Sequence, residues 1–508
     1  MAVRRVRTTS GRYAKTVRTW RPVRASHEDS LAERELTMRR AEDLVANDAH
    51  AASVVDTMAL NVSGGCGLLP QSQIKHKVLG LDPEQAKEIQ AQLEWAYHLW
   101  CAEAHVRGIA PFGALQYLAV RSMLGKGEYL YLVRQIRQPG RTFSTCLLDV
   151  HPARLCTPSD RKHDESLLDG VEQGPNGEAL AHWIANPDRN EWLAGHMASS
   201  RFTRVPTHRG HRPQVLHGFD YKDEETSRGR SILGPAAKLF RHMDDSLSYE
   251  LIAQIVTAST PFFIATQNPA DAQAGIGRST EVGQDGAVEV VRHQNVRPGQ
   301  FLYGNTGERP YPLESNRPGN NFDAFAYLIL RVMAASTGMP YEILAKDFSK
   351  TNYSSARAAL LEAWRVFSRW RFWLEWNLCQ RVWRLVQEEA FLLGLWTIPK
   401  GAPDIYLNGG LHPAWFSARW IGPKRGYVDP VKEIQANVVA LNAGLTTYAD
   451  LIAEQGQDWE ETWEQRALEE EVKREHGLAF STDVEVLEAV TASEERERAA
   501  ATAEGKED

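Results

Sequence analysis

Carboxylate and imidazole side chains are the residues of this 508-residue sequence that could serve catalysis or metal binding. The closest carboxylate groupings are Asp244-Asp245, inside a predicted helix, and Asp223-Glu224-Glu225, in a polar loop. Adjacent carboxylates on a helix or a loose turn point in different directions, so solvated charge is favoured for both groups. The sixteen histidines lack metal-ligand spacing, and His217 is predicted to be a strand histidine rather than a general base.

Other catalytic and ligand-binding motifs are missing from the sequence. No nucleophile elbow, HExxH helix or Walker pair occurs. The glycines between Val62 and Gln71 match neither GxxxxGK[ST] nor GxGxxG, so we predict a turn into an extended segment. The five cysteines are scattered and odd in number, which indicates reduced thiols and no zinc site: Cys66, Cys101, Cys146, Cys156 and Cys379. The sequence therefore predicts no metal, no cofactor and no enzymatic activity.

Composition indicates an ordinary soluble protein of two or three domains, with 43% hydrophobic and 24% charged residues. No apolar run approaches the roughly 18 to 20 residues of a membrane span, and the N-terminus lacks the apolar core of a signal peptide. We therefore expect synthesis in the cytoplasm without export and no membrane association.

The two ends of the chain carry opposite charge although the formal net charge is only −7. Residues 1–24 hold eight basic residues and no acid, whereas the tail from Glu460 is rich in glutamate. Two interpretations of the basic arm stay open: a solvated segment, or a segment that meets nucleic acid or an acidic partner.

The first half of the chain combines helices with antiparallel strands. A hairpin with an Asn176-Gly177 turn is the clearest local signal. Helices are predicted over 28–59, 82–104 and 112–124, and strands over 128–133, 146–150, 179–184 and 215–219. The pattern predicts an α+β region.

Two helices then bracket a small β segment. The first covers about 232–259, and the second begins at Phe322 and is stopped by Gly338 and Pro340. Between them the sequence predicts a glycine-rich loop over 268–286 and a strand over 287–291. This arrangement indicates a hairpin-like limb with a separate tip.

The strongest internal order lies after this limb. A polar stretch from Asp347 to Ser355 is predicted to form a loop that ends in a helix N-cap, and a long helix is predicted from Ala356 to about Leu393. The helix has two apolar stripes, one of them containing Trp370 and Trp373, so it must be covered on both flanks. A central helix of a monomer and a helix wedged between copies both fit. Arginines set between the tryptophans can stack on the indole rings.

Several short motifs, in this order and spacing, give the chain a resemblance to the portal proteins of lambda-type tailed bacteriophages. The resemblance covers roughly residues 30–460. It is carried by the Gly65–Gln71 turn, Gly127-Glu128, Val215-Leu216-His217, Arg228-Gly229-Arg230-Ser231, Asp347-Phe348-Ser349, Asn352–Arg357, Val428–Glu433 and Gly444–Thr447.

The resemblance implies an α+β portal-protein fold that assembles as a ring, usually of twelve subunits, at one vertex of the phage head. It implies a β-containing wing, long stem and core helices, and a small β-containing clip. The implied divisions are a basic arm (1–24), the wing (25–230), a first stem helix (231–260), the clip (261–316), a second stem helix (317–338), the tunnel-loop region (339–355), the core helix with wing return and crown (356–455), and an acidic tail (456–508).

The same resemblance implies roles for particular residues. The expected DNA-channel contacts of the tunnel loop are Lys346, Ser349, Lys350, Thr351, Asn352 and Arg357. The expected partner-binding residues of the clip are Arg292, Arg297 and Arg309, and the expected subunit-interface residues are Trp364, Trp370 and Trp373.

The partners implied are further copies of the chain, double-stranded DNA bound without sequence specificity, the terminase large subunit, a head-tail adaptor, and the major capsid and scaffold proteins. The implied location is the portal vertex of the virion, after synthesis in the host cytoplasm. Two alternatives are another virion connector or minor capsid protein, and a DNA-processing nuclease.

Overall fold

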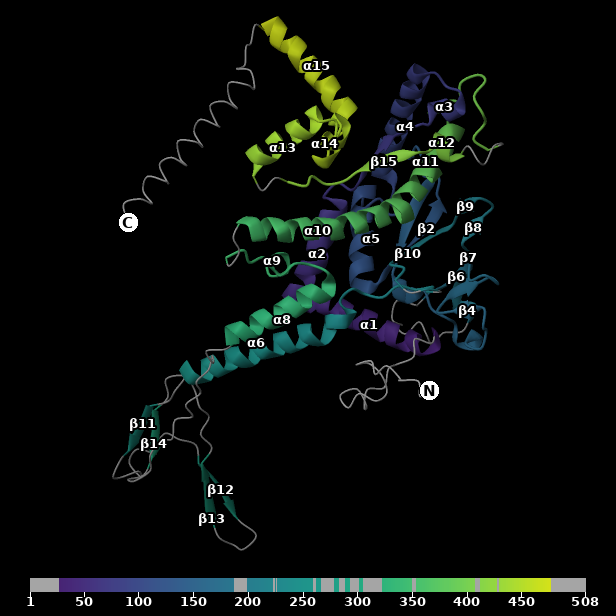
Figure 1. The fold of residues 1–508 in the computed structure, drawn as a ribbon. Coiled ribbons are helices and arrows are strands. Elements are labelled where there is room, and N and C mark those ends of the chain that lie inside the picture. The colour runs from purple at the N-terminus through teal and green to yellow at the C-terminus, as the bar shows by residue number, and fades with distance from the viewer. Residues whose placement is uncertain are drawn as a thin grey trace, which may run out of the picture. The chain divides into compact units, whose positions relative to one another are not determined.

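The computed structural model describes residues 27–186, 199–222, 224, 226–258, 262–265, 278–282, 288–292, 301–304, 322–349, 353–406, 412–426 and 429–476. The described residues form two compact units. The first unit lies within Met1–Leu68 and Ser72–Ala418, and the second within Leu69–Gln71 and Arg419–Asp508. Figure 1 shows the elements of each unit.

The helices of the first half follow the sequence prediction with one correction. The predicted 28–59 helix is two helices, α1 (His27–Asn47) and α2 (Ala49–Ser63), because Asp48 leaves the helical conformation and its carboxylate accepts a hydrogen bond from the Ala51 backbone N–H. The other helices here are α3 (His76–Leu79), α4 (Pro83–Glu103) and α5 (Phe112–Lys126). Asp82 and Gln85 form a capping box at the start of α4.

Two antiparallel sheets lie beside these helices. The first has the order β10-β2-β3 and comprises β2 (Glu128–Gln135), β3 (Thr145–Val150) and β10 (Val215–Phe219). The second has the order β4-β5-β6-β7 and comprises β4 (Leu167–Leu168), β5 (Val171–Gln173), β6 (Ala179–Ala185) and β7 (Phe202–Pro206). A small hairpin of β8 (His208–Arg209) and β9 (Arg212–Pro213) follows.

The predicted hairpin is confirmed, since β5 pairs antiparallel with β6 and Gly177 has a φ of +79° in the connecting turn. A shared apolar core joins the two sheets. Its buried members are Leu130, Leu132, Val150, Leu155, Val171, Ile184, Val205 and Val215.

The two limb helices are confirmed as α6 (Ala237–Ala258), which follows a 3₁₀ turn (Gly234–Ala236), and α8 (Phe322–Thr337). They pack side by side in Figure 1. The strands between them form two pairs. β11 (Phe262–Ala265) pairs parallel with β14 (Phe301–Gly304), and β12 (Arg278–Val282) pairs antiparallel with β13 (Val288–Arg292).

Strand β12 corrects the sequence analysis, because it lies inside the segment expected to be a glycine-rich loop. Its Arg-Ser-Thr-Glu-Val sequence has one strongly apolar residue, so periodicity alone could not detect it. Pairing with β13, which was expected, supplies the backbone hydrogen bonds.

The long helix is confirmed, with an irregularity, but it begins at Tyr353, so Tyr353–Ser355 are helical and not the end of the predicted loop. It comprises α10 (Tyr353–Leu374), a π-helical turn (Glu375–Cys379) and α11 (Gln380–Leu392), and α9 (Tyr341–Leu344) precedes it. A short helix α12 (His412–Trp415) completes the first unit. Helix α11 packs against α4, where Trp100 and Trp383 are completely buried.

The second unit contains three helices and most of the two-stranded sheet of β1 (Leu69–Ser72) and β15 (Ala418–Ile421). The helices are α13 (Pro430–Asn442), α14 (Tyr448–Glu454) and α15 (Trp459–His476). The Asp429 and Thr447 side chains cap α13 and α14, accepting backbone hydrogen bonds from Lys432 and Asp450. None of these three helices buries a residue.

Candidate functional site

The segment between α8 and α10 turns through two left-handed residues. Gly338 has a φ of +74° and ends α8, and Pro340 caps the short helix α9. Lys346 then takes a φ of +53°, one of two non-glycine residues with positive φ in the described chain. The Ala345 and Asp347 backbone N–H groups donate back to the carbonyl oxygens of Tyr341 and Glu342. Lys346 thus occupies the C-terminal capping position where glycine is usually found.

Lys346 lines a pocket of about 380 Å³ rather than projecting alone from the loop. The remaining lining residues come from α2, from the turn after it and from α5: Asp56, Thr57, Leu60, Gly64, Gly65, Ala114 and Tyr117. The capping conformation therefore places this exposed lysine at a pocket whose lining also includes Asp56.

The start of the polar stretch is held by one carboxylate. Asp347 accepts hydrogen bonds from the Tyr341 hydroxyl (3.2 Å) and from the backbone N–H (3.0 Å) and hydroxyl (2.6 Å) of Ser349. Ser349 is therefore fixed beside Asp347. Of the other predicted loop residues, Arg357 is exposed in the first turns of α10, while Lys350, Thr351 and Asn352 lie outside the described residues.

The predicted stacking of arginine on tryptophan is confirmed along α10. The Arg369 guanidinium lies 4.8 Å from the Trp370 ring centre, and that of Arg371 lies 5.2 Å from the Trp364 ring centre. The Trp373 indole N–H donates to the Phe219 carbonyl oxygen at 2.9 Å. The Trp373 hydrogen bond attaches this flank of α10 to β10.

The interface role expected for the three tryptophans stays a prediction. Trp370 is only 3% exposed in the single chain, so residues of its own chain already cover it and leave a neighbour almost nothing to contact. Phe372 and Trp376, one helical turn apart, are instead 66% and 65% exposed. Their spacing was a signal that the sequence analysis did not use.

The π-helical turn contains a half-buried acid, Glu375. Burial raises the pKa of Glu375 to about 7, and the nearby positive charge of Arg371 opposes that rise. Arg371 itself donates to the carbonyl oxygens of Asn61 (3.1 Å) and Val62 (3.4 Å), at the end of α2. The turn thus sits where α10 is attached to the first helices.

The limb helices carry apolar residues that the described chain leaves uncovered. Leu247, Leu251 and Ile255 follow one another at four-residue spacing on α6 and are 42%, 58% and 54% exposed. Phe325, Leu328 and Val332 form a matching stripe on α8 and are 52%, 58% and 46% exposed. We call these two rows the limb stripes. Their spacing is that of a helix face built to contact another surface.

The clip arginines are placed only in part. Arg292 is the last residue of β13 and pairs in register with Arg278 of β12. Arg297 and Arg309 lie outside the described residues.

Among the described residues, no group of three His, Cys, Asp or Glu side chains could hold a metal ion. Asp244 and Asp245 are exposed partners of Arg241, as solvated charges would be. Asp223 and Glu225 lie outside the described residues, and His217 is a strand residue bonded to Glu128. None of the helices that the structure describes meets the length and apolarity of a membrane span.

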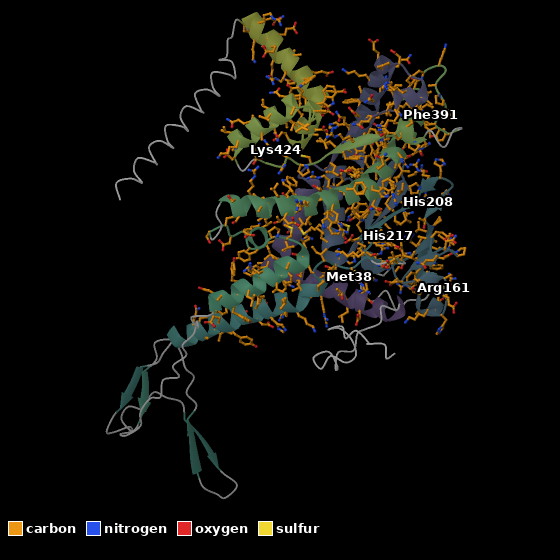
Figure 2. All side chains as sticks on the ribbon, in the orientation of Figure 1. Met38, Arg161, His208, His217, Phe391 and Lys424 are labelled. Atoms are coloured by element: carbon orange, nitrogen blue, oxygen red, sulfur yellow. The ribbon has the colours of Figure 1, made fainter. Side chains whose placement is uncertain are left out.

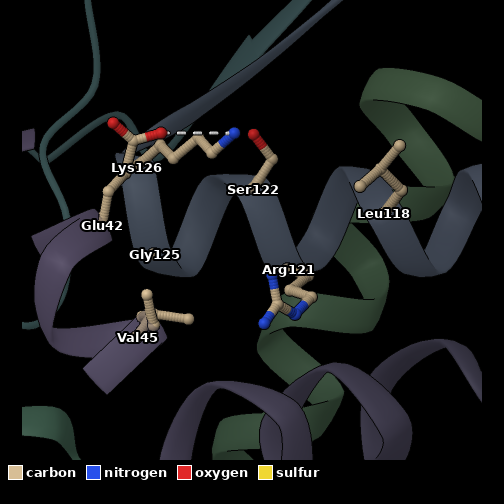
Figure 3. A pocket seen from close by; sticks show the side chains of 8 residues that line it. Glu42, Val45, Leu118, Arg121, Ser122, Gly125 and Lys126 are labelled. Carbon is tan, nitrogen blue, oxygen red and sulfur yellow. Dashed lines mark ion pairs between the residues drawn. The ribbon is translucent and has the colours of Figure 1, made fainter. Parts of the chain in front are cut away.

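A pocket of about 230 Å³ between α1 and α5 also fails to supply a catalytic site (Figure 3). Its main polar feature is Glu42, which contacts Lys126 at 3.4 Å and His151 at 2.6 Å. Burial favours a higher pKa for Glu42, but the bonds to His151 and Lys126 outweigh it and lower the pKa. The Glu42 carboxylate therefore stays ionised, and its partners within the fold already engage it.

Comparison with known proteins identifies relatives over most of the chain. The family model described as "Phage portal protein, lambda family" matches residues 13–371. The portal protein of Escherichia phage N15 is 25% identical over 460 residues, which cover 86% of this chain and 84% of that protein. Portal protein B of Escherichia phage lambda is 23% identical over 458 residues, with the same shares covered.

Solved structures similar to this chain include the neck of an empty gene transfer agent particle. That match has a TM-score of 0.38 and 16% identity, and covers 88% of this chain and 99% of the other. A chain of the native gene transfer agent virion matches with a TM-score of 0.36 and 15% identity, over 86% and 95% of the two chains.

The family match spans more than half of the sequence and includes the resemblance motifs from Gly65 to Arg357, but not those over 428–433 and 444–447. Members of this family are structural components of the virion and not enzymes, which sets aside the nuclease alternative. The chain therefore belongs to the lambda family of phage portal proteins.

Proposed function

We propose that copies of this portal protein assemble into a closed ring, of about twelve subunits in keeping with the implied family architecture. The central channel of the ring would pass double-stranded DNA without sequence specificity during packaging, retention and ejection. The observation that carries the proposal is the pair of limb stripes, because half-exposed apolar rows on two packed helices require a covering surface. A second copy of the same chain is the partner available at every position of a ring.

The division of the chain follows from this proposal. Helices α6 and α8 would form the stem (231–260 and 317–338), and the strands between them would form the clip (261–316). Residues 25–230 would form the wing, residues 339–355 would form the tunnel-loop region, and residues 356–455 would supply the core helix, wing return and crown. The basic arm (1–24) and the acidic tail (456–508) would flank these parts.

Sparse positive charge suits such a channel. Every tight Lys or Arg contact with a phosphate adds a salt-dependent barrier to sliding, and the chain has a formal net charge of −7. We propose that Lys346, Lys350 and Arg357 supply the few phosphate contacts of the loop, with Ser349, Thr351 and Asn352 beside them. Lys346 would have to leave the pocket at the end of α2 to reach DNA. Replacing Lys346 and Lys350 with glutamate should impair DNA packaging or retention, and unchanged packaging and retention would remove the loop from the proposal.

External partners would contact the remaining parts. We propose that Arg292, Arg297 and Arg309 of the clip face the terminase large subunit and later the head-tail adaptor. The wing and crown would contact the major capsid and scaffold proteins. The ring would be made in the host cytoplasm and would reside at the portal vertex of the virion.

The mass and symmetry of the purified protein test the ring directly. Native mass spectrometry with two-dimensional particle averages should reveal a closed assembly of about a dozen copies with a central hole. A monomer or dimer at all protein and salt concentrations, also after scaffold protein is added, would refute self-assembly into a ring.

A further inference from the structure

Three motifs that carried the family resemblance meet at one buried carboxylate. Glu128, the first residue of β2, has no solvent exposure of its side chain. Its Oε2 atom accepts hydrogen bonds from Arg228 Nε at 2.8 Å and from His217 Nε2 at 2.8 Å, and its Oε1 atom accepts one from Arg228 Nη2. Figure 2 labels His217, whose ring comes from β10. Residues 100 and 89 positions apart are thus joined at one point.

Arg228 extends the same cluster to the second sheet. Its Nη1 atom donates to the carbonyl oxygens of Leu155 (2.7 Å) and Asp169 (2.5 Å), and its Nη2 atom donates to that of Pro152 (3.2 Å). Asp169 lies in the turn between β4 and β5 with a left-handed φ of +48°. Its carboxylate accepts a hydrogen bond from Arg34 Nε of α1 at 2.6 Å.

The cluster is balanced in charge, and all of its charged groups except Asp169, which is 13% exposed, are buried. Two carboxylates, Glu128 and Asp169, face two guanidinium groups, Arg34 and Arg228. Burial alone would raise the pKa of Glu128, but the Arg228 charge and its hydrogen bonds outweigh it and hold the pKa well below the usual range. The neighbouring ring of His182 lies edge-on to His217 at 5.4 Å, and burial lowers the pKa of His182 to about 3. His182 therefore adds no charge near neutral pH.

The backbone around the cluster leaves no free space. A Cβ on Gly127 would lie 2.7 Å from the Arg230 backbone, and a Cβ on Gly229 would lie 1.9 Å from the Gly127 carbonyl oxygen. Ser231 Oγ and the Ile232 N–H both donate to the Leu124 carbonyl oxygen, at 3.0 and 3.1 Å. The 3₁₀ turn and α6 begin directly after this segment. The segment that leads into α6 is therefore fixed by its close contacts with Gly127 and by its hydrogen bonds to Leu124.

Stability alone does not explain such an arrangement. A buried ion pair often contributes no more than well-packed apolar residues of similar volume, because desolvation offsets the attraction. What apolar residues cannot supply is direction: a planar guanidinium accepts only one orientation against a carboxylate and a fixed set of carbonyl oxygens. The cluster therefore specifies geometry.

We propose that Glu128 and Arg228 are positioning residues that set the direction in which α6 leaves the two sheets. We call the contacts among Arg34, Glu128, Asp169, His217 and Arg228 the α6 anchor. The inference rests on the proposed function only in taking α6 for a stem helix. In that case the anchor joins wing and stem of each subunit into one rigid body before any neighbour is added.

Amide hydrogen exchange with mass spectrometry on the full chain tests the α6 anchor. The variants Glu128→Gln and Arg228→Met each leave one charge of the cluster without its partner, and should raise exchange over residues 228–243 by more than about tenfold. Exchange in α4 and α11, which touch no anchor residue, should stay the same. The double variant is neutral again, so its exchange should rise less than that of either single variant.

The matched control is Glu172→Gln, which breaks an exposed two-point ion pair with Arg204 at 2.8 Å in the same unit. This control should leave exchange over 228–243 unchanged. If Glu128→Gln or Arg228→Met does not fold, Arg34→Gln at the rim of the anchor is the substitute. It should raise amide exchange over the same residues, 228–243, by a smaller factor. Unchanged exchange over 228–243, or a rise spread evenly over the chain, would overturn the proposal.

Native mass spectrometry of the same wild-type and variant samples separates this proposal from the proposed function. A wild-type chain that never forms rings would count against the ring, while the local exchange pattern would still decide the anchor. If rings form and amide exchange in the variants rises evenly over the whole chain, the ring is supported and the α6 anchor is refuted.

Discussion

Shortening one residue of the limb stripes should weaken assembly without weakening the single chain. Leu328 on α8 is 58% exposed. Complete burial of a leucine contributes about 1.5 to 3 kcal/mol, so covering this exposed part contributes roughly 1 to 1.7 kcal/mol to each contact between neighbours. Because 1.4 kcal/mol corresponds to about a factor of ten, Leu328→Ala should weaken each contact by roughly 5- to 20-fold.

The assay is the protein concentration at which half of the chains are assembled, measured by mass photometry or sedimentation. A closed ring has as many contacts as subunits, so this concentration should rise by about the same 5- to 20-fold. The free energy of unfolding of the unassembled chain should change by less than about 0.5 kcal/mol, because the site is exposed there and alanine favours helix.

Leu180→Ala is the matched control, since Leu180 is 46% exposed but lies on β6, away from α6 and α8. It should leave the assembly concentration unchanged. An equal shift in the control, or a Leu328→Ala chain that assembles like the wild type, would refute the assignment of the limb stripes to subunit contacts.

Two further predictions concern the loop and the π-helical turn. Lys346→Gly should raise the free energy of unfolding by about 1 kcal/mol, because glycine adopts the φ of +53° without strain; a loss of stability in urea unfolding would contradict this. Glu375, with a folded pKa of about 7, favours folding in its protonated form, so its contribution is greatest below about pH 4.5 and is lost as pH rises from there through 7. The free energy of unfolding should therefore fall by roughly 2 kcal/mol less between pH 5 and 8 in Glu375→Gln than in the wild type. An equal fall in both proteins would show that the acid does not titrate in this range.

Local signals predicted much of the fold correctly. The end of α8 at Gly338 was predicted because a helix stop depends on residues within one helical turn. The hairpin of β5 and β6 follows likewise from its own turn residues. The break at Asp48 and the strand β12 were missed. The N-cap signal of Asp48 was overlooked inside an otherwise helical pattern, and β12 depends on its pairing with β13.

In the candidate site, too, features that depend on neighbouring residues were predicted and features that depend on distant elements were not. The polar stretch at Asp347 was predicted as a loop from its side chains, and the hydrogen bonds of Asp347 to Ser349 agree with that prediction. The place of Lys346 in the pocket at the end of α2 was not predicted, because it depends on α2 and α5, far away in the sequence.

By itself, the sequence determined most of the element types, the absence of catalytic motifs and the family resemblance, because each depends on residue order and short spacing. Only the tertiary structure decided which stripe of α10 is covered, so that Trp370 is buried while Phe372 and Trp376 are exposed. It alone brought Glu128, His217 and Arg228 together at one buried point. The physical reason is that periodicity reveals which residues share a face, whereas burial and ion pairing depend on elements that meet only after the chain has folded.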